Sequence, residues 1–281
     1  QHAIDTKMNH IILVPLDFSE VCNNAMPHAA EAARYLNFKV MLLHVVDKNT
    51  KAQLKKENKG ISSIDERLLD IATEVKEQYS IEVEHLSREG DIFTTIAEVA
   101  QDLGANLIYL GTHGKVGMQK LTGSFAIKVV TSSPVPVVVV QKKPFDKGYH
   151  KVVLPITSDA GPWEKTKWAA FIAKNFNSEV HVYQLDNPAL DETIRIITKH
   201  FGEQEVAYKV IKSEGGNFSK QVIEYATANM ADLIMIMTNP DKGFGKFILG
   251  SYDEEMIFNS SQIPVMCINP RKYNWEKIFK I

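Results

Sequence analysis

The chain has 281 residues, of which 44% are hydrophobic and 23% are charged, and its formal net charge is −2. A chain of this length favours two domains over one, and the apolar fraction is that of ordinary globular cores. Charges of both signs are interspersed without a basic stripe, which argues against nucleic acid or an anionic membrane surface as a partner. No apolar run in the sequence approaches the ~20 residues of a membrane span and no signal peptide is recognisable, so we expect a cytoplasmic protein.

The two ends of the chain add two smaller expectations. Residues 1–8 precede the first apolar run, so we interpret them as a leader or an expression remnant outside the fold, with Met8 as a natural start. Cys22 and Cys267 are the two cysteines of the sequence. We interpret both as buried or half-buried thiols in a reducing compartment.

Short apolar runs alternate with helical patterns through the first half of the chain. The predicted strands are 10–15, 39–46, 81–87, 106–110 and 136–140. Most of these runs are nearly continuous Val, Ile and Leu, which indicates burial on both faces, as in a parallel sheet covered by helices.

Helices are predicted between these strands. Residues 68–75 and 92–103 each carry their apolar side chains on one helical face. Asp91 is a suitable N-cap for the second of these helices, and Gly104 is a suitable stop. The Lys-rich stretch 48–60 has neither pattern, and we expect it to be a mobile surface loop.

The second half of the chain repeats this order. Segments 151–156, 179–185, 206–211 and 263–269 correspond to the first, second, third and fifth strands, and 216–237 aligns without a gap with 90–111. We therefore predict an α/β fold with two tandem doubly wound domains, each with a five-stranded parallel sheet flanked by helices. The predicted domains are 9–142 and 151–281, joined by a polar linker at 143–150.

A glycine-rich segment follows the fourth predicted strand. It contains Gly111 and Gly114, and Gly123-Ser124 then opens the next predicted helix. Glycine allows positive φ and close backbone approach, and a helix N-terminus presents N–H groups to an anion, so the segment suits a polyphosphate. A loop that merely turns tightly would have the same composition, and the segment alone leaves both interpretations open.

Together with the run Leu-Asp-Phe-Ser at 16–19, this segment closely resembles the universal stress protein family. That family has an Asp after the first strand and the pattern Gly-x2-Gly-x9-Gly-Ser/Thr after the fourth. The Leu-His-Val run at 43–45 resembles the strand end that lies against adenine in its ATP-binding members. The positions that match are Asp17, Val45, Gly111, Gly114, Gly123 and Ser124.

The resemblance implies a ligand and a mode of assembly. Asp17 and Val45 would contact the adenosine part of ATP or another adenine nucleotide, with Mg²⁺ as a possible companion. The three glycines and the serine would hold the ribose and phosphates. The two domains would pair through their last strands within one chain, with a homodimer and an unknown protein partner as further possibilities.

Two departures from the family pattern limit these expectations. Eight residues, not nine, lie between Gly114 and Gly123, so the loop has a shorter rim or shifts the helix that follows. In the second half, Met237 and Pro240 replace the first two glycines, and Thr157 stands where Asp17 stood. Pro240 has no N–H to offer a phosphate, so we expect the second domain to bind no ATP in the family manner.

Simpler interpretations accompany several of these residues. Asp17 could instead cap the first helix. His44, Asp47 and the loop residue His113 are expected to be ordinary strand-end or loop residues, because no acidic partner that would orient a histidine base is recognisable. Trp163 and Trp168 are expected to pack within the fold or to form an interface, and the histidines show no metal-binding spacing.

The function predicted from these observations is that of a stress-response regulatory protein that binds an adenine nucleotide in its first domain. The second domain would be a degenerate partner. No catalytic residue is recognisable, so any ATP hydrolysis would be slow and incidental. The alternative is a nucleotide-independent scaffold. An ATP pyrophosphatase or adenylyltransferase ranks last, because neither an SGGxDS loop nor an HxGH motif occurs.

Overall fold

The computed structural model describes residues 9–18, 20–112, 123–157, 162–238, 251–271 and 275–279. These fall into two compact units, which lie within Asp5–Phe145 and Asp146–Ile281 and are called the first and the second unit below. The division lies inside the segment 143–150 that the sequence assigns to a linker. No helix in the described part of the chain is long and apolar enough to cross a membrane.

The first unit is built on a five-stranded parallel sheet in the order β3-β2-β1-β4-β5. Its strands are β1 Ile11–Pro15, β2 Lys39–Val46, β3 Val83–Glu89, β4 Leu107–Gly111 and β5 Val137–Val140. The strand order reverses between β1 and β4, so the carboxyl edge of these strands is where an open α/β sheet offers a ligand crevice.

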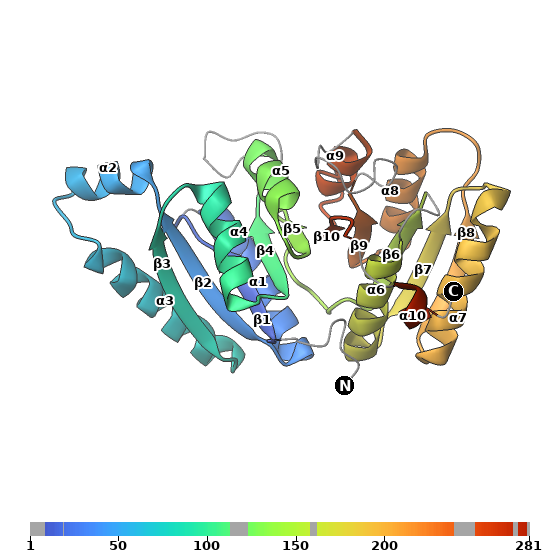
Figure 1. The fold of residues 1–281 in the computed structure, drawn as a ribbon, viewed down its shortest axis with the longest axis horizontal. Helices are drawn as coiled ribbons and strands as arrows, with labels where there is room; N and C mark the ends of the chain where they lie inside the picture. The colour runs from blue at the N-terminus through green and yellow to red at the C-terminus, as the bar shows by residue number, and fades with distance from the viewer. Residues whose placement is uncertain are drawn as a thin grey trace. The chain divides into compact units, whose positions relative to one another are not determined.

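Helices cover both faces of this sheet. They are α1 Glu20–Leu36, α2 Lys48–Lys56, α3 Ser62–Tyr79, α4 Ile92–Leu103 and α5 Gly123–Ser132. The helices α1 and α3 pack beside each other on one face, and α4 and α5 pack beside each other on the other (Figure 1). Every residue of β1, β4 and β5 is buried, which explains their uninterrupted apolar sequences.

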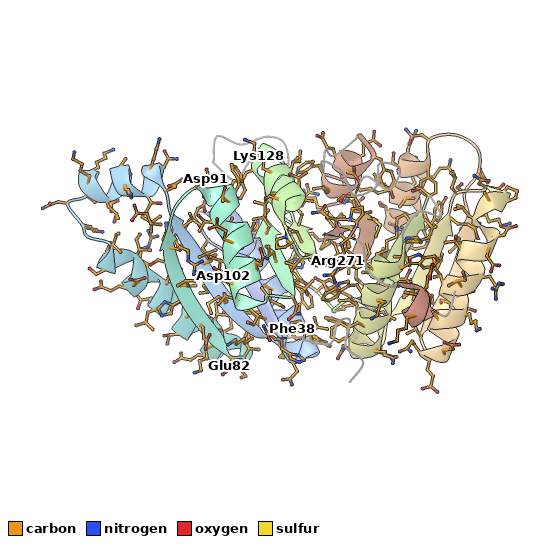
Figure 2. The ribbon with its side chains drawn as sticks, in the orientation of Figure 1. Phe38, Glu82, Asp91, Asp102, Lys128 and Arg271 are labelled. Carbon is orange, nitrogen blue, oxygen red and sulfur yellow. The ribbon has the colours of Figure 1, made fainter. Side chains whose placement is uncertain are left out.

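The predicted ends of α4 are confirmed. The Asp91 side chain accepts hydrogen bonds from the backbone N–H groups of Phe93 and Thr94, both at 3.1 Å. Gly104 ends the helix at φ 62°, a left-handed conformation that glycine adopts without strain. Asp91 and Asp102 mark the two ends of this helix in Figure 2.

The second unit has the same strand order, β8-β7-β6-β9-β10, again with parallel pairing throughout its described strands. Its strands are β6 Lys151–Ile156, β7 Glu179–Gln184, β8 Ala207–Lys212, β9 Leu233–Met237 and β10 Val265–Ile268. Its helices are α6 Trp163–Phe176, the 3-10 turn η1 Pro188–Leu190, α7 Asp191–Glu203, α8 Phe218–Ala228, α9 Ser251–Ile257 and α10 Trp275–Phe279. The α/β fold of two doubly wound units is thereby confirmed.

Several smaller expectations can be compared with this fold. Most of the observed strands begin or end one or two residues from their predicted limits. Trp168 is buried and meets the Phe171 ring edge-on, and Trp163 packs against Phe279, so both tryptophans pack as predicted. Cys267 is a buried thiol whose pKa is raised by burial, while the side chain of Cys22 lies outside the described residues.

The expectation of a mobile loop at 48–60 is wrong. Lys48–Lys56 forms the helix α2, and Asp47 caps it by accepting a hydrogen bond from the Thr50 backbone N–H at 2.9 Å. Leu54 is the buried residue that anchors the helix. The composition misled because α2 is short and all of its charged side chains are exposed to solvent.

Candidate functional site

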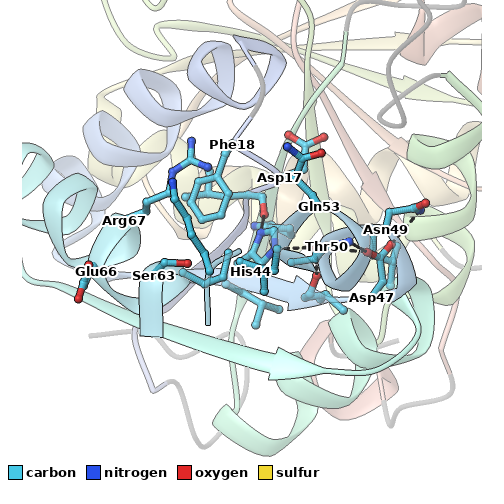
Figure 3. Close-up of a pocket in the computed structure, with 18 of the residues that line it drawn as sticks. Asp17, Phe18, His44, Asp47, Asn49, Thr50, Gln53, Ser63, Glu66 and Arg67 are labelled. Carbon is cyan, nitrogen blue, oxygen red and sulfur yellow. Dashed lines mark hydrogen bonds between the residues drawn. The ribbon is translucent and has the colours of Figure 1, made fainter. Parts of the chain in front are cut away.

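A cavity of about 450 Å³ opens at the carboxyl ends of β1 and β2 in the first unit (Figure 3). Side chains of α2 and α3 form one wall, and Ile92 and Ile96 of α4 with Phe125 of α5 form the other. Volumes of a few hundred Å³ are typical of sites for small organic ligands. The cavity also lies at the carboxyl edge of the sheet, where the reversal of strand order between β1 and β4 predicts a ligand site.

Two of the residues expected to contact adenosine line this cavity. Asp17 lies two residues after the end of β1, and Val45 lies in the last part of β2. The two strand ends are held together because the Leu16 backbone N–H donates to the Leu43 carbonyl at 2.7 Å. The Val45 carbonyl accepts a hydrogen bond from the Asp47 backbone N–H at 3.1 Å.

The glycine-rich segment is only partly described. Gly111 is the last residue of β4 and lies opposite Val140 in β5. Gly123 begins α5, as the sequence predicted, and Phe125 two residues later reaches the cavity wall. Gly114 lies outside the described residues, as does the side chain of Ser124. The structure therefore brings the beginning of α5 to the same cavity as Asp17 and Val45.

His44 is the best-fixed polar group of the cavity. Its side chain is 4% exposed. The Nδ1 atom lies 2.7 Å from the Leu16 carbonyl oxygen and the Nε2 atom lies 3.0 Å from Thr50 Oγ1. Burial lowers the pKa of His44, so the ring is neutral at pH 7, with Nδ1–H donating to Leu16. This histidine was expected to be an ordinary strand-end residue, but it joins β1, β2 and α2.

An aromatic stack lines part of the cavity. The Phe18 ring lies on the His44 ring with centroids 4.5 Å apart and an interplanar angle of 21°. The Arg67 guanidinium lies over the Phe18 ring, 4.0 Å from its centroid. Figure 3 shows Phe18 between these two side chains. Phe18 has φ 65°, in the left-handed region that residues other than glycine seldom adopt.

The lining of the cavity is mainly acidic. Five carboxylates face two cationic side chains, namely Asp17, Asp47, Glu57, Glu66 and Asp70 against Lys59 and Arg67. All of these except Asp17 belong to α2, α3 or the residues beside them. A polyphosphate would be repelled along that wall. The α5 side offers the dipole of a helix N-terminus instead.

The second unit differs at the equivalent positions. Lys39 pairs with Ile11 in the first unit and Glu179 pairs with Lys151 in the second, so the register of the first two strands is the same. On this alignment Thr157 takes the place of Asp17 and Gln184 takes the place of His44. Gln184 is buried, and its Nε2 has no hydrogen-bond partner among the residues described.

The second unit also differs from the first in having a buried pair of charged residues. Lys165 in α6 takes the place of Ala25, and its Nζ donates to the Pro155 carbonyl oxygen. Asp253 in α9 takes the place of Ala126. Both side chains are less than 5% exposed, and burial lowers the pKa of Lys165 to about 7. The described residues hold no cluster of three or more His, Cys, Asp or Glu side chains that could bind a metal ion.

Three residues that line the cavity, His44, Phe18 and Arg67, were not among the predicted site residues. His44 carried a usable signal, because a histidine inside a buried strand needs hydrogen-bond partners. Phe18 stands next to Asp17 in a motif that drew attention only to its aspartate. Arg67 gave no signal, since its place over Phe18 depends on how α3 packs against the strand ends.

Comparison with known proteins agrees with this architecture. The model of the "Universal stress protein family" matches residues 8–141. A universal stress protein of Synechocystis sp. is 34% identical over 133 residues, which are 46% of this chain and 83% of that protein. One from Methanocaldococcus jannaschii is 30% identical over 138 residues, 47% of this chain and 81% of the relative.

The fold likeness extends to both units. The crystal structure of a universal stress protein from Archaeoglobus fulgidus covers 94% of this chain and 99% of its own, with a TM-score of 0.75 and 19% identity. At that identity the likeness concerns the fold alone. The sequence matches in the first unit and the repeated fold together show that the chain is a tandem, two-domain member of the universal stress protein family.

Proposed function

We propose that this chain is a stress-response regulatory protein that binds ATP or another adenine nucleotide in the cavity of the first unit. One observation supports the proposal most directly. Asp17, Val45 and the beginning of α5 all lie at the same cavity, which has a volume of about 450 Å³. The Asp17 carboxylate would accept hydrogen bonds from the adenosine part. Apolar side chains on the α4 and α5 side would contact the base or the sugar.

The charges around the cavity suggest one orientation for the nucleotide. The wall formed by α2 and α3 carries most of the carboxylates, so the phosphates would extend away from it. The N–H groups at the beginning of α5 would receive them, with Gly111, Gly114, Gly123 and Ser124 as the residues we expect to approach the ribose and phosphates. Any Mg²⁺ would arrive bound to the phosphates.

The second unit would act as a degenerate partner. Thr157 lacks the carboxylate of Asp17, and Pro240 lacks the N–H that a phosphate cradle uses. The buried Lys165 and Asp253 occupy positions at which the first unit has alanine. We infer a regulatory role without catalysis, in which a bound nucleotide alters contacts with a protein partner.

Titration calorimetry with ATP, AMP and a cyclic nucleotide tests the proposal. Asp17→Ala removes a hydrogen bond to a charged group, which is worth about 1.5–3 kcal/mol, so its affinity for the tightest ligand should fall about tenfold or more. The matched control is Thr157→Ala at the equivalent position of the second unit, which should bind as tightly as the wild type. Equal affinities for Asp17→Ala and the wild type would contradict the proposed site.

The alternative function is a nucleotide-independent scaffold. The acidic lining favours it, because five carboxylates near a cavity mouth oppose a polyphosphate. The shortened spacing between Gly114 and Gly123 favours it as well. If the wild-type protein gives no heat with any of the three nucleotides and releases none when denatured after purification, the scaffold is the better account.

A further inference from the structure

The stack of Arg67, Phe18 and His44 in the cavity wall has the geometry of an occupied base-binding slot. The Phe18 ring is planar, lies nearly parallel to the His44 ring at 4.5 Å, and carries a guanidinium over it at 4.0 Å. Stacking of this kind is how proteins hold nucleobases, because a base also has a π face that accepts both an aromatic ring and an arginine.

The Arg67 guanidinium is positioned by its contact with the Phe18 ring. It lies exposed on α3 and makes no hydrogen bond or ion pair with any residue that the structure describes. Its five N–H donors are therefore available at the rim of the cavity. An arginine that only stabilised α3 would be expected to pair with Asp70, which lies three residues later on the same helix and also lines the cavity.

The backbone conformation of Phe18 also indicates a ligand site. Its φ of 65° lies in the left-handed region, where the side chain of an L residue is sterically disfavoured. Such conformations persist where the surroundings hold them and are concentrated at ligand sites and switch regions. Here the two stacking partners hold the ring. A ligand that replaced the ring between them would also release the backbone.

We propose that Phe18 is an internal substitute for the nucleotide base, which must leave the slot between Arg67 and His44 before adenine stacks there. This inference rests on the proposed function, because it describes how the same cavity is regulated. His44 stays fixed by Leu16 and Thr50 and forms the floor of the slot. Arg67 forms its movable cover. Nucleotide affinity is thus lowered by the fraction of molecules in which Phe18 fills the slot.

Calorimetric titration of AMP into Phe18→Gly tests this gate. Glycine adopts the observed φ without strain and removes the competing ring, so AMP should bind about tenfold more tightly if Phe18 fills the slot in nine-tenths of molecules. Ribose 5-phosphate, which lacks the base, should bind both proteins equally. The matched control is Ser80→Gly, which places glycine at another non-glycine residue of positive φ, 54°, far from the cavity in sequence. It should leave AMP binding unchanged.

Arg67→Ala and Arg67→Lys examine the cover of the slot. Both are made in the Phe18→Gly background, because Arg67 also covers the Phe18 ring and its loss would otherwise weaken the competing ring as well. Both remove the planar guanidinium, so both should weaken AMP binding about fivefold relative to Phe18→Gly and leave ribose 5-phosphate binding unaltered. A loss for alanine alone would indicate charge in place of stacking and would contradict the slot. In the wild type, nuclear Overhauser contacts between the Phe18 and His44 rings should be present in the free protein and disappear at saturation with AMP.

The outcomes separate the gate from the proposed function. If neither the wild type nor Phe18→Gly binds AMP, the nucleotide site itself is wrong and the gate is overturned with it. If the wild type binds AMP and Phe18→Gly binds it no more tightly, only the gate is overturned. Persistence of the contacts between Phe18 and His44 in the AMP complex would likewise overturn the gate and leave the nucleotide site standing.

Discussion

At the scale of single residues, Lys165 is the most unusual side chain of the second unit. It is 4% exposed, and its ammonium donates to the Pro155 carbonyl oxygen inside the fold. Lysine is almost never buried to this extent without a close partner. Desolvation lowers its pKa to about 7, while the Asp253 carboxylate partly opposes that shift. The corresponding residue of the first unit, Ala25, has no charge to remove from water.

This burial predicts a pH dependence of stability. The folded pKa of Lys165 lies below its unfolded value, so the unfolded chain binds more protons between about pH 7 and 10. The free energy of unfolding should therefore rise with pH over that window, by about 1 kcal/mol per pH unit. Lys165→Met, of similar length, should flatten the rise in urea unfolding measured at pH 7, 8 and 9. An unchanged slope in the variant would contradict the assignment to Lys165.

At the scale of elements, the strands and most helices could be predicted from the sequence, and α2 could not. The strands β1, β4 and β5 are uninterrupted apolar runs, which indicate burial on both faces, and α4 has both a capping aspartate and a stop glycine. In α2 the signal is weaker, because Leu54 is its buried residue and lysines dominate the rest. Its stability comes from Asp47 at the N-cap and from contacts with β2.

The role of Asp47 leads to a prediction about local stability. Loss of an N-cap costs about 1 kcal/mol, so amide hydrogen exchange within α2 should become about fivefold faster in Asp47→Ala. Asp47→Ser, which supplies another good capping oxygen, should exchange like the wild type. The amides of α4, capped separately by Asp91, serve as the internal control. Equal protection of α2 in the alanine and serine variants would show that the cap is not what holds the helix.

The packing of helices and strands also explains which residues of the site could not be predicted from the sequence. The positions of Asp17 and Val45 at adjacent strand ends follow from the alternation of strands and helices alone. The position of Arg67 does not, because it requires the packing of α3 over the strand ends and the turn at Phe18. No periodicity encodes either of these. The residues that are proposed to regulate the cavity therefore emerge only from the three-dimensional arrangement.

At the scale of the whole molecule, the repeat preserves the fold more strictly than the site. The strand order and the register of the first two strands are the same in both units. Even a cross-strand ion pair recurs with its charges exchanged, as Lys39–Glu84 at 3.1 Å in the first unit and Lys209–Glu179 at 3.7 Å in the second. By contrast, the equivalents of Asp17 and His44 are Thr157 and Gln184, which have different hydrogen-bonding chemistry and carry no carboxylate or imidazole.

The measurement that tests this account most directly is the number of adenine nucleotides bound per chain, determined by native mass spectrometry with ATP or AMP at saturation. We predict one nucleotide per chain in the wild type and in Thr157→Ala, and an occupancy of about one half or less in Asp17→Ala at the lowest ligand concentration that saturates the wild type. Two nucleotides per chain would show that the second unit retains a working site. A single nucleotide that persists at full occupancy in Asp17→Ala would place the ligand outside the cavity of the first unit and contradict the account.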